Sequence, residues 1–99
     1  MVKHVLFVKL KEYSPEGCER VRDLFLSMKD QIPFLRELNV GIDYLCSERS
    51  YDVVLELVVD DREALQAYQS HPYHVEQVKP YIHQVRSGSA TVDYEYDKK

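Results

Sequence analysis

The sequence predicts an α+β protein of the ferredoxin-like type, with one four-stranded antiparallel sheet and the element order β-α-β-β-α-β. Two observations support this prediction. Segments that alternate between two residue faces, as strands do, open and close the chain and occur twice in its middle. Two segments with apolar residues three and four positions apart, as in helices, separate them. The 99 residues suit a single domain, which we place over residues 1–99.

The first strand is expected over residues 2–11, where side chains alternate between two faces. The more apolar face, which we assign to the helix-covered side of the sheet, carries His4, Leu6, Val8 and Leu10. The opposite face is mixed and carries Lys3, Val5, Phe7, Lys9 and Lys11. Both faces hold apolar residues, so we expect both to be at least partly covered.

The first helix is expected to begin after Ser14, because a capping hydroxyl is followed by proline at the first helical position and by Glu16. Pro33 ends it. One stripe with helical spacing should face the core: Cys18, Val21, Leu24, Phe25, Met28 and Ile32.

Two further strands are expected at residues 38–45 and 51–59, joined by the polar segment 47–50. Gly41 weakens the first of them and marks a bulge or a close backbone approach. The second is rich in β-branched residues, as strands are. Its core-facing side chains are expected to be Val53, Leu55, Leu57 and Val59.

The second helical segment is predicted to begin at Asp60, which forms a capping box with Glu63. His71 and Pro72 interrupt it, because the residue before a proline is disfavoured in the helical region. A new helix then starts at Pro72, with an apolar stripe at Val75, Val78, Ile82 and Val85 and a kink at Pro80. A turn at Gly88 leads into the last strand, expected over residues 90–96.

Composition narrows the function classes. The formal charge of −4 comes without the basic patch that phosphate binding requires, so we expect no nucleic-acid partner. No apolar run approaches the ~20 residues of a membrane helix, and the first residues lack the features of a signal peptide. Cys18 and Cys46 are too few for a disulfide framework. We therefore expect a cytoplasmic protein that does not contact membranes.

The open face of the sheet predicts a homodimer. Helices can cover only one face, which leaves Val5, Phe7, Val54 and Val58 on the other. Apolar surface is costly to leave in water, and a two-fold dimer is the commonest closed way to cover it. We expect the sheets of two copies to face each other.

Three residues form a candidate site: His74, His4 and Tyr68. His74 lies in the first turn of the helix that Pro72 begins, where the helix dipole favours a neutral ring that can act as a general base. His4 would be the orienting or polarising partner of His74, and the Tyr68 hydroxyl would donate to a carbonyl or enolate oxygen. His71 and Pro72 are interpreted as the structural joint between two helices.

Each of these residues also has a purely structural interpretation. His4 fits a buried histidine bonded to a backbone carbonyl, and Tyr68 fits an ordinary core residue. His71 and His74 lack a third ligand at a convincing spacing for a metal, so we predict no metal and no cofactor. His83 receives no role.

Four segments resemble the stress-response dimeric α/β-barrel (Dabb) domain family: residues 2–5 (VKHV), 41–43 (GID), 68–75 (YQSHPYHV) and 92–94 (VDY). The resemblance spans nearly the whole chain and implies a ferredoxin-like protomer in a homodimer whose sheets form a barrel. It also implies that His74, His4 and Tyr68 match the catalytic and supporting residues of a plant polyketide cyclase that needs no cofactor. This chain differs in having Tyr73 where that cyclase has a small residue.

The leading hypothesis is therefore a homodimer of this family that binds or transforms a small, apolar, polyketide-like carbonyl compound without a cofactor. One alternative is a non-catalytic dimeric module for stress tolerance or regulation. A second is a ferredoxin-like monooxygenase, although the chain has no tryptophan, which such enzymes often place near the substrate.

Overall fold

The computed structural model describes residues 1–97 and confirms the ferredoxin-like fold. Its elements are β1 (Val2–Leu10), α1 (Pro15–Gln31), β2 (Glu37–Ile42), β3 (Val53–Val59), α2 (Arg62–Ser70), the π-helical turn η1 (His74–Val78), α3 (Lys79–Val85) and β4 (Arg86–Glu95). The strands form one antiparallel sheet in the order β2-β3-β1-β4. Among the described residues, no helix is long and apolar enough to cross a membrane.

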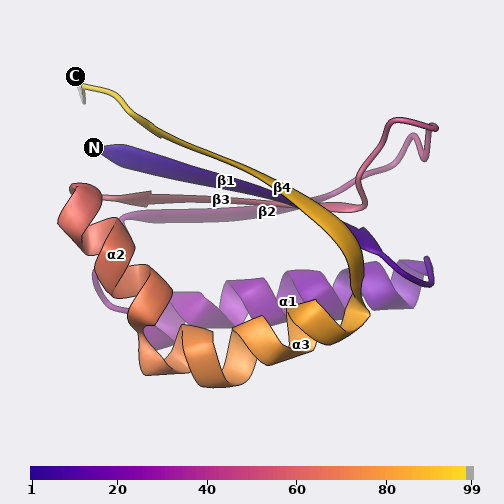
Figure 1. The fold of residues 1–99 in the computed structure, drawn as a ribbon, viewed down its shortest axis with the longest axis horizontal. Coiled ribbons are helices and arrows are strands. Elements are labelled where there is room, and N and C mark those ends of the chain that lie inside the picture. Colours follow the sequence, from indigo (N-terminus) through magenta and orange to yellow (C-terminus); the bar gives the residue numbers. More distant parts are fainter. Residues whose placement is uncertain (98–99) are drawn as a thin grey trace.

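The helices all lie on one face of this sheet (Figure 1). The core fills the space between the two layers, and its β1 contribution is the face predicted to be covered. Val8 is fully buried there, and Leu10 and His4 are only 7% and 6% exposed. β3 adds Leu55 and Leu57, both fully buried. The buried face predicted for these two strands is therefore confirmed. Val58, expected to be left uncovered on the opposite face, is nevertheless only 2% exposed.

Helix α1 begins and ends as its sequence predicts. The Ser14 side chain accepts a hydrogen bond from the Gly17 N–H at 2.9 Å, and Pro15 occupies the first turn. The last helical residue is Gln31, and Ile32 is already extended, one residue before Pro33. The buried side chains of the helix are four members of the predicted stripe: Cys18, Val21, Phe25 and Met28.

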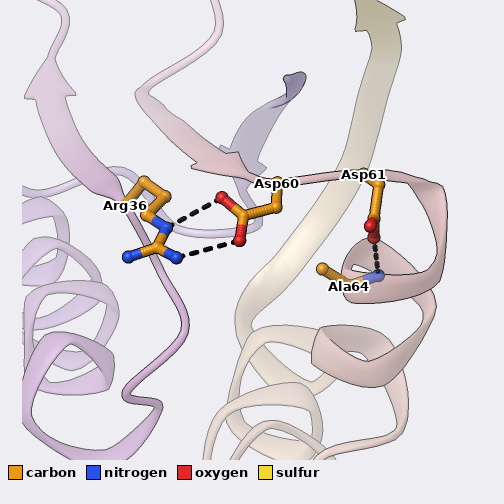
Figure 2. A network of polar contacts seen from close by, with 4 residues as sticks. All are labelled: Arg36, Asp60, Asp61 and Ala64. Carbon is orange, nitrogen blue, oxygen red and sulfur yellow. Dashed lines mark hydrogen bonds and ion pairs between the residues drawn. The ribbon is translucent and has the colours of Figure 1, made fainter.

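The start of α2 differs from the prediction by one residue. The cap is Asp61, whose carboxylate accepts a hydrogen bond from the Ala64 N–H at 2.8 Å (Figure 2). Asp60 instead binds the guanidinium of Arg36 through two bonds of 2.8 and 2.9 Å. The predicted capping box is therefore wrong, because the position three residues after the true cap is alanine.

The connection between β2 and β3 is longer than predicted. β2 ends at Ile42, because the Asp43 carboxylate accepts the Cys46 N–H at 2.7 Å and closes a turn in which Cys46 has a positive φ of 54°. Tyr44, predicted to lie in a strand, is 92% exposed. Asp52 is buried before β3, where its carboxylate accepts the Leu10 N–H at 2.8 Å.

The second helical region contains a π turn at the predicted kink. Pro80 has no N–H and would clash with the carbonyl four residues earlier in an α-helix, and a wider turn relieves that conflict. The N–H of Lys79 bonds the carbonyl of His74, five residues back. The wider turn changes the helical phase, so Val75 is 43% exposed and its predicted core position is wrong.

No turn separates α3 from β4. Arg86 follows the helix directly with extended backbone, and the strand runs from there to Glu95. The predicted turn at Gly88 is wrong, because this glycine pairs with Lys9 inside the sheet and has no positive φ. An added Cβ at Gly88 would meet no atom within 4 Å, so the position does not require glycine.

The opposite face of the sheet is open in the single chain. No helix covers it (Figure 1), and apolar side chains of β1 and β4 reach solvent there. Val92 is 57% exposed, Tyr94 45% and Phe7 36%. Removing such an area from water is worth about 25 cal/mol per Å², so this face favours association with a partner surface.

Candidate functional site

A pocket of about 180 Å³ lies between the sheet and the helices. Its apolar wall is formed by Leu6, Phe25, Val78 and Ile82. The three residues proposed from the sequence, His74, His4 and Tyr68, all line it. They come from three elements: η1, β1 and α2. The fold therefore brings together side chains that are up to 70 positions apart in the sequence.

His74 enters the pocket from the first residue of η1. Its Nδ1 lies 3.1 Å from the backbone carbonyl oxygen of Gln69, near the end of α2. A carbonyl can only accept, so Nδ1 must carry the proton and donate it. In the neutral ring, Nε2 then keeps its lone pair and can accept a proton.

The pKa of His74 is lowered from its ordinary value. Burial is the largest cause, because the apolar surroundings disfavour the charged ring. The positive charge of Lys79 lowers the pKa further, whereas the bond to Gln69 partly opposes these effects. Burial thus outweighs the helix dipole as the reason for a neutral ring, and His74 is in its basic form at neutral pH.

His4 is held by a carboxylate from the neighbouring strand. His4 and Asp93 are direct partners in the β1–β4 register, so both side chains lie on the helix-facing side of the sheet. The Nδ1 of His4 is hydrogen-bonded to Oδ1 of Asp93. The predicted alternative, a bond from His4 to a backbone carbonyl, is replaced by this pair. Nδ1 carries the proton, which leaves Nε2 as the free end of the ring.

Tyr68 lies between the two imidazoles. Its ring centroid is 4.6 Å from that of His74 and 5.8 Å from that of His4. The residue is 1% exposed, and its hydroxyl is 3.8 Å from the sulfur of Met28, a weak acceptor. Burial and the negative charge of Asp93 raise the pKa of the hydroxyl, so it stays protonated and can donate.

His71 and Pro72 occupy the joint between α2 and η1. The His71 ring accepts the Tyr73 N–H at 3.1 Å, and the His71 carbonyl accepts the Val75 N–H at 2.9 Å. Its ring also lies edge-on to Phe34, with 6.2 Å between centroids. His71 does not line the pocket.

Tyr73 points elsewhere as well. Its hydroxyl lies 2.6 Å from Oγ of Ser27 on α1, and the residue does not line the pocket. The larger side chain between Pro72 and His74 therefore leaves the pocket open. It links η1 to α1 instead.

The sequence reasoning missed four polar residues that matter to this site. Asp93 holds His4, while Lys79, His83 and Arg86 line the pocket. The alternation gave no signal for Asp93, because it places this acid opposite the apolar side chains of the last strand. His83 and Lys79 are four residues apart and share a helix face. Arg86 had no such signal.

Within residues 1–97, no group of three or more His, Cys, Asp or Glu side chains is arranged to hold a metal ion. The site instead combines a basic imidazole, a second imidazole paired with a carboxylate and a phenol that stays protonated. Such groups can remove a proton from a carbon acid and stabilise the oxygen that gains charge.

The chain matches the family model described as "Stress responsive A/B Barrel Domain" over residues 2–96. No curated protein sequence matches it. Among solved structures, a dimeric ferredoxin-like protein of unknown function from Bacteroides fragilis is 24% identical, with a TM-score of 0.81 and coverage of 96% of this chain and 95% of the other. A protein from Arabidopsis thaliana is also 24% identical, with a TM-score of 0.83 and coverage of 100% and 98%.

A hydroxynitrile lyase from Passiflora edulis shares the fold at only 12% identity, with a TM-score of 0.82 and coverage of 99% and 94%. At these identities the likeness to solved structures concerns the fold. The function must be argued from the pocket itself.

Proposed function

Because the chain belongs to the stress-responsive A/B barrel domain family, we propose that it binds a small, largely apolar carbonyl compound and transforms it by acid–base chemistry that needs no cofactor. The proposal rests mainly on the environment of His74. Its tautomer is fixed by Gln69, its pKa is lowered by burial, and it borders an apolar pocket. A neutral imidazole in that setting is suited to remove a proton from carbon.

The proposed step is proton abstraction next to the carbonyl group. Nε2 of His74 takes the proton, the C–H electron pair forms the enolate, and negative charge moves to the carbonyl oxygen. The hydroxyl of Tyr68 donates a hydrogen bond to that oxygen, and His4, which lines the same pocket, orients or polarises the reacting groups. For Tyr68 this requires its proton to turn from the Met28 sulfur, which is a weak bond to give up.

Asp93 acts as a positioning residue in this proposal. Its carboxylate accepts the Nδ1–H of His4 and fixes the orientation of that ring. A carboxylate placed behind an imidazole has the same effect in other acid–base sites.

We further propose that the protein is a homodimer joined through the open sheet faces. Exposed apolar side chains on β1 and β4 support this arrangement, as do solved neighbours described as dimeric. The pocket lies on the other face of the same sheet, so such a dimer leaves it accessible.

A non-catalytic role is the second candidate. The internal partners of two site residues favour it, since His4 is bonded to Asp93 and Tyr68 to Met28. In that case, replacing His4 or His74 by alanine lowers stability, and no carbonyl compound raises the melting temperature.

Hydrogen–deuterium exchange tests the proposed chemistry without knowledge of the natural substrate. We expect the protein to speed the exchange of the protons next to the carbonyl of 2-octanone in D₂O, followed by NMR. His74→Gln should reduce the catalysed rate at least about 100-fold, as expected for loss of a general base. His71→Gln is the matched control, because His71 does not line the pocket.

The Asp93→Asn variant tests the positioning role of Asp93 separately from proton abstraction by His74. We expect it to slow exchange less than His74→Gln does, with His4→Gln giving no further loss in the Asp93→Asn background. Binding of 2-octanone with no catalysed exchange by the native protein would contradict the enzymatic proposal and favour the non-catalytic one.

A further inference from the structure

The pocket also contains basic side chains that the proposed reaction does not use. Its lining includes Lys79, His83 and Arg86, together with the polar Ser89. Within residues 1–97, no aspartate or glutamate lines the pocket. This is unusual in a chain with 17 acidic and 13 basic residues, where an acidic neighbour would be expected by composition.

A bulge in the sheet directs Arg86 into the pocket. Lys9 pairs with Gly88, but Leu10 pairs with Arg86, so Ser87 is an extra residue in β4. Without the bulge Leu10 would face Ser87, and Arg86 would point to the opposite side of the sheet. The irregularity therefore places a guanidinium on the helix-facing side.

Arg86 is half-buried, and its side chain makes no hydrogen bond or ion pair with any of residues 1–97. Three other arginines are paired with carboxylates: Arg22 with Asp23, Arg36 with Asp60 and Arg62 with Glu95. Arg20 and Arg49 are exposed to solvent, whereas Arg86 is half-buried. A partly desolvated guanidinium that lacks a carboxylate is an anion-binding group.

Arg86 lies far from His4 along the sheet, whereas Lys79 lies close to His74, the proposed base. His4 pairs with Asp93 near one end of the β1–β4 ladder, and Arg86 pairs with Leu10 at the other. Six strand residues at ~3.3 Å each separate the two positions by about 20 Å of backbone. Leu6, Val78 and Ile82 line the pocket that joins them. A ligand that spans this distance must be elongated and apolar in its middle.

We propose that the natural ligand is an elongated apolar carboxylic acid whose carboxylate binds Arg86. This rests on the proposed function, because it assigns the far end of the same pocket. The carboxylate end would fix the chain so that its carbonyl-bearing end lies at His74. A carboxylate group matches the planar guanidinium in shape. It is also small enough for the Arg86 end of the pocket.

The competing interpretation is that these basic residues only complement the carboxyl end of α3. His83 lies in its last turn, and Arg86 is its C-terminal cap, whose N–H bonds the Ile82 carbonyl. On that interpretation the charge of the ligand has no effect on its affinity. The two interpretations therefore differ in a measurable quantity.

Octanoate and octanamide are the probes, because they differ in charge but hardly in size. We expect calorimetric titration to give octanoate an affinity about tenfold higher, as for a hydrogen bond to a charged group, and this preference should shrink as salt is added. Arg86→Gln should abolish the preference while octanamide still binds, and Arg86→Lys should retain part of it. Arg49→Gln is the matched control, since Arg49 is exposed in a loop away from the pocket.

Each outcome decides between the proposals. Equal affinity of the native protein for both probes would overturn the carboxylate subsite and leave the proposed function intact. A preference that survives Arg86→Gln but disappears in His74→Gln would overturn the assignment to Arg86. Failure of both probes and of 2-octanone to bind would contradict the proposed function itself. If Arg86→Gln lowers the melting temperature, the single variants Arg86→Lys and Lys79→Gln are used instead. Their affinities for octanoate and octanamide give the same comparison in a folded protein.

Discussion

At the scale of single residues, the chemistry of His74 depends on one backbone carbonyl and on burial. The Gln69 carbonyl fixes which nitrogen carries the proton, and the apolar surroundings keep the ring neutral. His4 has a different environment, since a carboxylate holds its ring. In the proposed reaction, the two imidazoles near Tyr68 have different roles: His74 accepts a proton, and His4 orients or polarises the reacting groups.

The lowered pKa of His74 predicts a stability that depends on pH. The unfolded chain protonates this ring near pH 6.5, whereas the folded protein does so only at lower pH. Between these two values the unfolded state binds more protons, so stability falls as pH falls and levels off below the pKa of the folded state.

Melting temperatures between pH 5 and 8 test this prediction. His74→Gln should show a smaller loss of stability below pH 6.5 than the native protein. Equal slopes for His74→Gln and the native protein would contradict the lowered pKa.

At the scale of elements, two helix boundaries shape the site. The joint at His71 and Pro72 ends α2 and starts a helix that carries His74 into the pocket. Pro80 then imposes the π turn, which widens the helix where it borders the pocket. Functional sites often contain such turns, and here its residues His74 and Val78 line the cavity.

The cap of α2 gives a prediction at this scale. Asp61→Ala should lower the free energy of unfolding by about 1 kcal/mol, because the Ala64 N–H loses its acceptor. Asp61→Asn should retain nearly all of it, since asparagine caps as well as aspartate. Urea denaturation measures both, and an equal loss in the two variants would show that charge rather than capping matters.

At the scale of the whole molecule, the two faces of the sheet differ in what covers them. The helices pack on one face of the sheet (Figure 1). The pocket lies on that side, and the other face carries exposed apolar side chains. Neighbouring residues of β4 face opposite sides of the sheet: Asp93 bonds His4 on the helical side, and Val92 lies on the open face. A dimer through that face would stiffen the strand that positions the site.

The proposed dimer predicts a mass of twice 11.7 kDa in sedimentation at micromolar concentration. Val92→Glu should give the monomer, because two facing copies would bury two unpaired charges. Leu26→Glu is the matched control: Leu26 is also exposed but lies on α1, on the helical side. A dimer that survives Val92→Glu but not Leu26→Glu would place the interface on the helices.

The sequence determined the element types, their order and the buried faces of β1 and β3. Those features follow from local periodicity, as the alternation around Val8 and the stripe around Phe25 illustrate. The alternation also placed His4 on the helix-facing side of β1, and the break at His71 and Pro72 placed Tyr68 and His74 on either side of one joint.

Only the tertiary structure decided the partners across the sheet. Asp93 pairs with His4 because of the β1–β4 register, and Arg86 enters the pocket because of a bulge one residue long. A shift of one residue reverses which face a strand side chain occupies, and nothing local in the sequence marks that shift. The sequence thus determined which residues could act, while the register decided which of them meet.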